Sequence, residues 1–294
     1  MVYAAVGQAI AKDDVESGTE LSGSSGDSAK LTDDLPEDSR WRLVALGMGL
    51  CLFHLLATYP LPDELVFIAP VNRPYHHMRL TVFFGFGVPF LMQGYSSRIR
   101  LCLQPLLCML IFWLAVQSIL LATIGLWLQL SLAVALLLAV LILAWPLRSM
   151  AWLWDFASGA YRHLWDPDVA LRVKIYTVVF SIFPFGLVMP IFGPWDSVEL
   201  WVRWRPYNIQ AELLWRGTFA TFFLAFFLAA ANPKVCNSIV AFFAWHGICH
   251  SISMFVDNRI LPADGNDNLE HLLEISVFMV LGLTNCFVGT KVWF

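Results

Sequence analysis

The sequence predicts an all-α integral membrane protein with about eight transmembrane helices. Its composition is the first reason: 59% of the 294 residues are hydrophobic and only 14% are charged. A soluble domain carries about 25% charged residues, so this chain has too little polar surface to stay in water. The second reason is the length of its apolar runs, and the third is the long interval from Arg100 to Arg148 without any charge.

The apolar runs have the length of about 20 residues that a helix needs to cross the roughly 30 Å hydrocarbon core of a bilayer. The interval between Arg100 and Arg148 would extend about 70 Å as one helix at 1.5 Å per residue. It must therefore fold back, and Thr123–Gly125 is the predicted turn. The eight predicted helices are 41–60, 78–96, 101–122, 125–146, 174–193, 212–231, 234–256 and 269–291.

Two segments do not have the composition of a membrane span. Residues 1–40 are rich in Ser, Gly, Asp and Glu, and such a segment is predicted to be a disordered acidic tail because it cannot bury enough apolar surface to fold. It lacks the basic start and apolar core of a secretory signal, so we expect it in the cytosol. The sequence of residues 148–173 predicts an amphipathic helix that lies in the membrane interface. The alternative is a loop that its Trp and Tyr side chains anchor there.

The distribution of Lys and Arg predicts the orientation of the chain. With the N-terminus inside, twelve of the 18 Lys and Arg residues fall on the inner side and six on the outer side. Because cytoplasmic segments carry the excess of positive charge, we expect the N- and C-termini in the cytosol.

A short repeated pattern indicates an internal duplication. Arg73-Pro74-Tyr75 is followed by Arg79-Leu80-Thr81, and Arg205-Pro206-Tyr207 is followed by Arg216-Gly217-Thr218. This echo predicts two tandem four-helix membrane units, 41–147 and 174–294, related by an axis along the membrane normal.

The C-terminal part of the chain resembles a known family. The segments ANPKVCNSIVAFFAWHGICHSISMFVDN and LEHLLEISVFMVLG are similar to the last two helices of small DoxX-like four-helix membrane proteins of uncharacterised function. Those proteins pair an apolar helix bearing His-x-x-x-Met with a later helix that opens on polar residues. The resemblance covers residues 212–292, and it implies a fold but no activity.

Ionisable residues are predicted to gather in one layer of the outer leaflet. His250 and Glu274 fall at similar depths on consecutive antiparallel helices, so we expect them to pair. Ionisable groups inside a bilayer mark a functional site by default, because they are costly to bury. The predicted layer consists of His54, Arg79, Arg216, His250, His271 and Glu274.

Three interpretations of this layer remain open. In the first it is structural, with His250 bonded to Glu274 and the arginines extending to the headgroups. In the second it lines an outward-facing cavity that binds or transports a small molecule or a proton. In the third, the chain is a metal-dependent membrane oxidoreductase that binds iron, copper or zinc; the metal ligands would be His246, His250, His271 and Glu274.

Other functional classes have little support. The sequence contains no cluster of Lys and Arg that would indicate nucleic-acid binding. It also contains no sequence motif of a hydrolase, a nucleoside triphosphatase or a dinucleotide-binding protein. All six cysteines fall in apolar segments, where they are typical buried hydrophobes. His76 and His77 are interpreted as solvated loop residues. The predicted partners are the lipid bilayer and a small-molecule ligand, and the sequence indicates neither a cofactor nor an oligomeric state.

Overall fold

The computed structural model describes residues 40–58, 73–96, 98–99, 101–144, 209–231, 236–260 and 269–289. The chain divides into two units, Met1–Asp34 and Leu35–Phe294, and every described residue belongs to the second. Within the described residues all regular elements are helical, which confirms the predicted all-α class. The predicted tail, the predicted interfacial segment 148–173 and the predicted helix 174–193 lie outside the described residues.

The other seven predicted helices are present with small differences at their ends. The largest difference is at the second, which begins five residues earlier than predicted, at Arg73 rather than at residue 78, and so includes His76 and His77. The helices are α3 (Arg40–Thr58), α5 (Arg73–Tyr95), α6 (Leu103–Thr123), α7 (Trp127–Ala144), α10 (Ile209–Ala231), α11 (Asn237–Phe255) and α12 (Leu269–Gly289), and α11 continues into the short π-helical turn η5 (Val256–Ile260).

The predicted turn between α6 and α7 is confirmed. Helix α6 ends at Thr123 and α7 begins at Trp127. Gly125 has a φ of 77°, a left-handed conformation that glycine adopts without the steric penalty of a Cβ. Its backbone N–H donates to the carbonyl of Ala122, and that of Leu126 donates to Leu121. These bonds satisfy the last carbonyls of α6 as the chain reverses.

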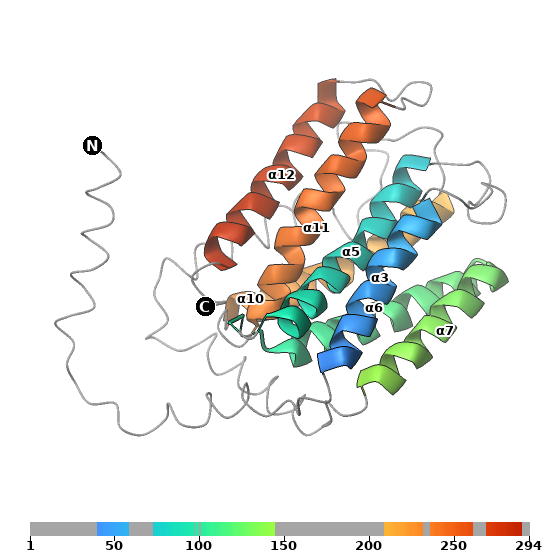
Figure 1. Ribbon diagram of the computed structural model, residues 1–294. Coiled ribbons are helices and arrows are strands. Elements are labelled where there is room, and N and C mark those ends of the chain that lie inside the picture. Colours follow the sequence, from blue (N-terminus) through green and yellow to red (C-terminus); the bar gives the residue numbers. More distant parts are fainter. Residues whose placement is uncertain are drawn as a thin grey trace, which may run out of the picture. The chain divides into compact units, whose positions relative to one another are not determined.

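The most extensive helix contacts are those of α11 with α12, α3 with α5, and α11 with α5 (Figure 1). Two of these contacts depend on glycine pairs. A Cβ added at Gly247 would lie 2.9 Å from Cα of Gly282 in α12, and one added at Gly47 would lie 2.7 Å from the carbonyl oxygen of Gly87 in α5. The backbones therefore touch directly, as is common where helices pack without a strong hydrophobic force between them.

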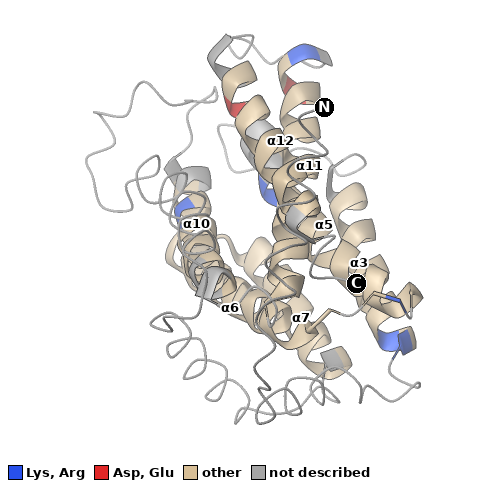
Figure 2. Ribbon diagram, turned by 90° about the vertical axis from the view of Figure 1, so that its left-hand side faces the viewer, with Lys and Arg blue, Asp and Glu red and all other residues tan. Residues whose placement is uncertain are grey.

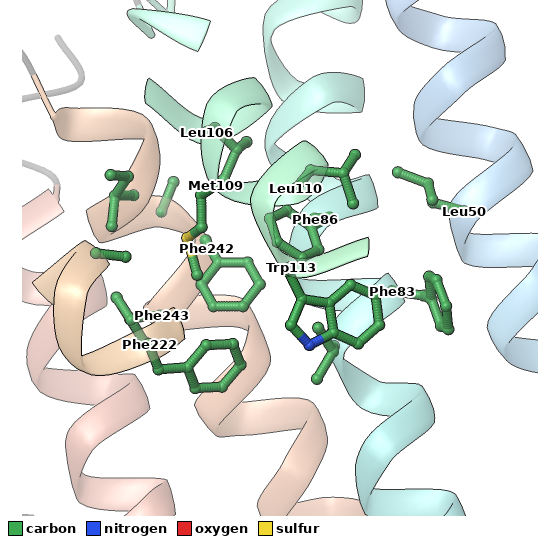
Figure 3. Packing of buried hydrophobic residues seen from close by; sticks show 14 of the residues in the cluster. Leu50, Phe83, Phe86, Leu106, Met109, Leu110, Trp113, Phe222, Phe242 and Phe243 are labelled. Carbon is green, nitrogen blue, oxygen red and sulfur yellow. The ribbon is translucent and has the colours of Figure 1, made fainter. Parts of the chain in front are cut away.

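The contact of α5 with α11 also requires a glycine. A Cβ added at Gly85 would lie 2.7 Å from Cβ of His246. Next to it, Phe86 packs on Phe242 with ring centroids 4.5 Å apart, and Phe242 packs edge-on against Phe222 of α10 at 5.1 Å. Figure 3 shows these rings beside Trp113 of α6. The aromatic core thus joins α5, α6, α10 and α11.

The described helices combine buried faces with exposed apolar rows. Leu132, Leu138 and Ile142 of α7 and Leu273, Val280 and Leu283 of α12 are all at least half exposed. Charged residues are few along these helices (Figure 2). Among the described residues, the helices long and apolar enough to cross a membrane are Leu103–Thr123 and Asn237–Arg259. These features fit a membrane-associated protein, while the predicted eight spans stay a prediction.

The helix contacts follow a pattern that relates the two predicted units. Helix α5 packs on α11, and α10 packs on α6. The predicted repeat aligns α5 with α10 and α6 with α11, so each contact is the counterpart of the other. Helices from both predicted units therefore share one core. The duplication itself stays a prediction, because helix 174–193 lies outside the described residues.

We expect Gly247→Ala to lower the melting temperature of the protein in detergent. The added methyl group would press on the backbone of Gly282, and overpacking of this kind costs about 1–3 kcal/mol. Gly49→Ala is the matched control, since a Cβ there meets nothing within 4 Å. Alanine at that position should leave the stability unchanged or raise it by up to about 1 kcal/mol. Equal effects of the two substitutions would contradict the proposed close approach.

Candidate functional site: a buried histidine pair between α5 and α11

Three polar or soft side chains of α11 share one buried face. His246, His250 and Met254 follow each other at intervals of four residues and are 3%, 1% and 0% exposed. Because side chains four residues apart lie above one another on a helix, the spacing brings the two imidazole rings together. Their centroids are 5.2 Å apart.

The hydroxyl group of Thr81 in α5 bridges the two imidazoles. Its Oγ1 atom lies 3.3 Å from Nδ1 of His246 and 3.4 Å from Nδ1 of His250. Thr81 is fully buried, so all three polar groups meet inside the helix interface. Buried polar groups are stable only when they are hydrogen-bonded, and this bridge supplies such a partner on each ring.

Aromatic rings surround the histidine pair. His246 stacks on Phe242 at 5.4 Å and meets Phe222 edge-on at 5.0 Å. His250 packs on Phe278 of α12 at 4.2 Å and meets Trp215 of α10 edge-on at 5.6 Å. The pair is thus enclosed by α5, α10, α11 and α12, and its rings lie among apolar groups rather than in bulk water.

A second polar contact joins α5 to the end of α11. Nδ1 of His77 lies 2.9 and 3.0 Å from the two carboxylate oxygens of Asp257. Asp257 belongs to η5, and π-helical turns of this kind occur often at functional sites. The interpretation of His77 as a solvated loop residue is therefore wrong, since His77 lies in α5. Its side chain is only 14% exposed, because Asp257 contacts it from a segment far along the chain.

Helix α3 contributes a third histidine beside α11. Nε2 of His54 lies 3.8 Å from the thiol of Cys249, and the ring meets Phe84 edge-on at 5.9 Å. His54 is 8% exposed. The structure thus brings His54, His77, His246 and His250 to the contacts that α11 and η5 make with α3 and α5. All six cysteines, including Cys249, are free thiols.

The other predicted site residues lie on neighbouring helices. Arg79 is on α5 two residues before Thr81, Arg216 follows Trp215 on α10, and Glu274 is on α12 one turn before Phe278. The contacts described for His250 run to Thr81 and to aromatic rings. Its pairing with Glu274 stays a prediction, and the His271 side chain lies outside the described residues.

The structure describes the side chains of three of the four predicted metal ligands, His246, His250 and Glu274. Among the side chains that the structure describes, no group of three or more His, Cys, Asp or Glu residues is arranged to hold a metal ion. Two of the four predicted ligands, His246 and His250, do lie side by side. The set that includes His271 stays a prediction, because that side chain is outside the described part.

A second hydroxyl bridge lies at the position that the predicted repeat aligns with the histidine pair. Oγ1 of Thr218 in α10 accepts hydrogen bonds from Nε1 of Trp113 at 3.0 Å and from Nε2 of Gln117 at 3.2 Å. Trp113 and Gln117 are four residues apart on α6, as His246 and His250 are on α11. The predicted repeat aligns Thr81 with Thr218. Thr81 is not among the predicted site residues, and its match to Thr218 is the sequence signal that could have identified it.

No protein-family model, no curated protein and no solved structure matches this chain. The resemblance to DoxX-like proteins therefore stays a prediction, and the candidate function depends on the site alone.

Two tryptophans allow the Thr218 bridge to be tested. Trp113→Phe removes an indole N–H that bonds Thr218, and we expect a loss of about 1 kcal/mol in the free energy of unfolding beyond the loss of ring volume. Trp215→Phe removes the same volume, but the Nε1 atom of Trp215 has no hydrogen-bond partner among the described residues. Chemical unfolding in mixed micelles should show the larger loss for Trp113→Phe, and a larger loss for Trp215→Phe would contradict the assignment.

Proposed function

We propose that the chain is a multi-pass membrane protein that binds and transports a proton or a small proton-linked solute through the buried histidine pair. The observation that carries this proposal is the position of the Thr81 hydroxyl within hydrogen-bond reach of Nδ1 of both His246 and His250. Imidazole is the side chain whose charge changes most readily near neutral pH, and each of its nitrogens can donate or accept.

The membrane part of the proposal is supported by the exposed apolar rows of α7 and α12. Monomeric soluble proteins rarely expose contiguous apolar patches of this kind, whereas lipid tails cover them without loss. The excess of Lys and Arg in the segments predicted to be inside supports cytosolic termini.

The transport part is supported by the ionisable groups around the pair. His77 with Asp257 lies where α5 meets η5, and His54 with Cys249 lies between α3 and α11. Polar side chains within a membrane usually mark the pathway of an ion or a substrate. A purely structural role would be served by fixed donors and acceptors, as at Thr218, without side chains that exchange protons.

The proposed orientation is tested by accessibility in intact cells. A cysteine at Asp264 should react with a membrane-impermeant thiol reagent above the background of the wild-type chain, because this loop is predicted to face outside. A cysteine at Ser158 should react only after the cells are opened. The reverse labelling pattern would contradict the orientation.

The proposed transport is tested with purified protein in liposomes that enclose a pH-sensitive dye. A potassium diffusion potential should drive proton uptake in wild-type vesicles, and His250→Gln should reduce the rate by about tenfold or more, because the amide still forms hydrogen bonds but takes up no proton. His163→Gln, in the predicted interfacial segment, is the matched histidine control and should keep the wild-type rate. Wild-type uptake equal to that of empty vesicles would exclude proton transport.

A further inference from the structure

We infer that the Thr81 hydroxyl is the switching element of the histidine pair, and that it passes a proton between Nδ1 of His246 and Nδ1 of His250. This inference rests on the proposed function, because it names the proton as the transported species and Thr81 as the group that moves it.

The hydrogen count of the bridge constrains the two rings. A hydroxyl group has one hydrogen, so Thr81 can donate to only one Nδ1 at a time. If it donates to His250, then Nδ1 of His250 carries no hydrogen and its proton is on Nε2. His246 must then donate its own Nδ1–H to Thr81 for the contact of 3.3 Å to be a hydrogen bond. The proposed relay therefore requires the two neutral histidines to be opposite tautomers.

Proton transfer through this bridge conserves every atom. A proton that arrives on Nε2 of His246 converts that ring to imidazolium. The Nδ1–H bond of His246 breaks as its proton moves to Oγ1 of Thr81, and the original O–H bond of Thr81 breaks as its proton moves to Nδ1 of His250. His250 then releases the proton on its Nε2. Both rings have exchanged tautomers, and they must revert before a second proton follows in the same direction.

The second hydroxyl bridge shows what the first would be if it were only a structural contact. Thr218 accepts from two side chains that are always donors in this geometry, an indole N–H and an amide N–H, and its own hydrogen is directed to the carbonyl of Leu214 at 3.0 Å. Every hydrogen of the Thr218 bridge therefore has a fixed position. The two ring nitrogens that contact Thr81 can each exchange donor and acceptor roles, so the direction of a transfer between them is reversible.

The helices and the turn that adjoin the pair carry the charged and titratable groups from which a proton could reach it. Helix α3 contributes His54, α5 contributes His77 and Arg79, and η5 contributes Asp257. Helices α10 and α12 contribute Arg216 and Glu274, and Cys249 lies on α11 itself. The contact of His77 with Asp257 is one helical turn from Thr81 along α5, so it is the nearest described carboxylate contact on that helix.

The tautomers are measured by ¹⁵N NMR of the full-length protein in lipid bilayers, labelled at both ring nitrogens of histidine. Signals are assigned by comparison with His246→Asn and His250→Asn. At a pH where both rings are neutral, wild type and Thr81→Ser should show one ring protonated at Nδ1 and the other at Nε2. Thr81→Val, which keeps the shape of threonine without the hydroxyl, should lose this complementarity. Both rings protonated at the same nitrogen in wild type would overturn the inference.

Proton uptake into liposomes supplies the second measurement. Thr81→Val should reduce the rate by about tenfold or more, whereas Thr81→Ser should stay within about twofold of wild type, because only the hydroxyl takes part in the transfer. Thr218→Val is the matched control for a lost buried hydroxyl, and it should lower the melting temperature without a comparable loss of rate. If the wild-type protein transports protons and Thr81→Val transports them equally fast, the role of Thr81 is refuted but the proposed function is not. If the wild-type protein shows opposite tautomers but no transport, the proposed function is refuted.

Discussion

The absence of a side chain at Gly85 is the constraint on which the histidine site depends. A methyl group there would overlap Cβ of His246, so any larger residue would push α5 away from α11. The hydroxyl of Thr81 is one turn from Gly85, and its contacts of 3.3 and 3.4 Å are already near the limit of a hydrogen bond. A small separation of the two helices would therefore break both contacts.

Most of the helices could be predicted because their signal is local. A continuous apolar run between charged or Pro-rich segments defines each span, and the turn at Gly125 follows from the excessive length of the run that contains it. The start of α5 was predicted too late for a reason that is not local. His76 and His77 read as a polar loop, but Asp257 lies 180 residues away in sequence and covers His77 in the folded chain.

The site could be predicted in part. Helical spacing placed His246 and His250 on one face, and the structure buries both. Depth along the helices suggested Glu274 as the partner of His250, but depth carries no information on how a helix is rotated about its axis. That rotation is determined by close contacts such as Gly247 with Gly282. Thr81 has no distinctive motif of its own, and only its counterpart Thr218 marks it in the sequence.

The bridge joins residues that are 165 and 169 positions apart, and this separation determines when the site can form during synthesis. Helix α5 leaves the ribosome long before α11, so a nascent chain has Thr81 but neither histidine. In that interval a threonine hydroxyl bonds the carbonyl of its own helix four residues earlier, as Thr221 does in the finished fold. Long-range contacts form slowly and late. The histidine pair is therefore among the last features to assemble, and a chain interrupted before Asn237 has the aromatic faces of α5 and α10 without the helix that joins them.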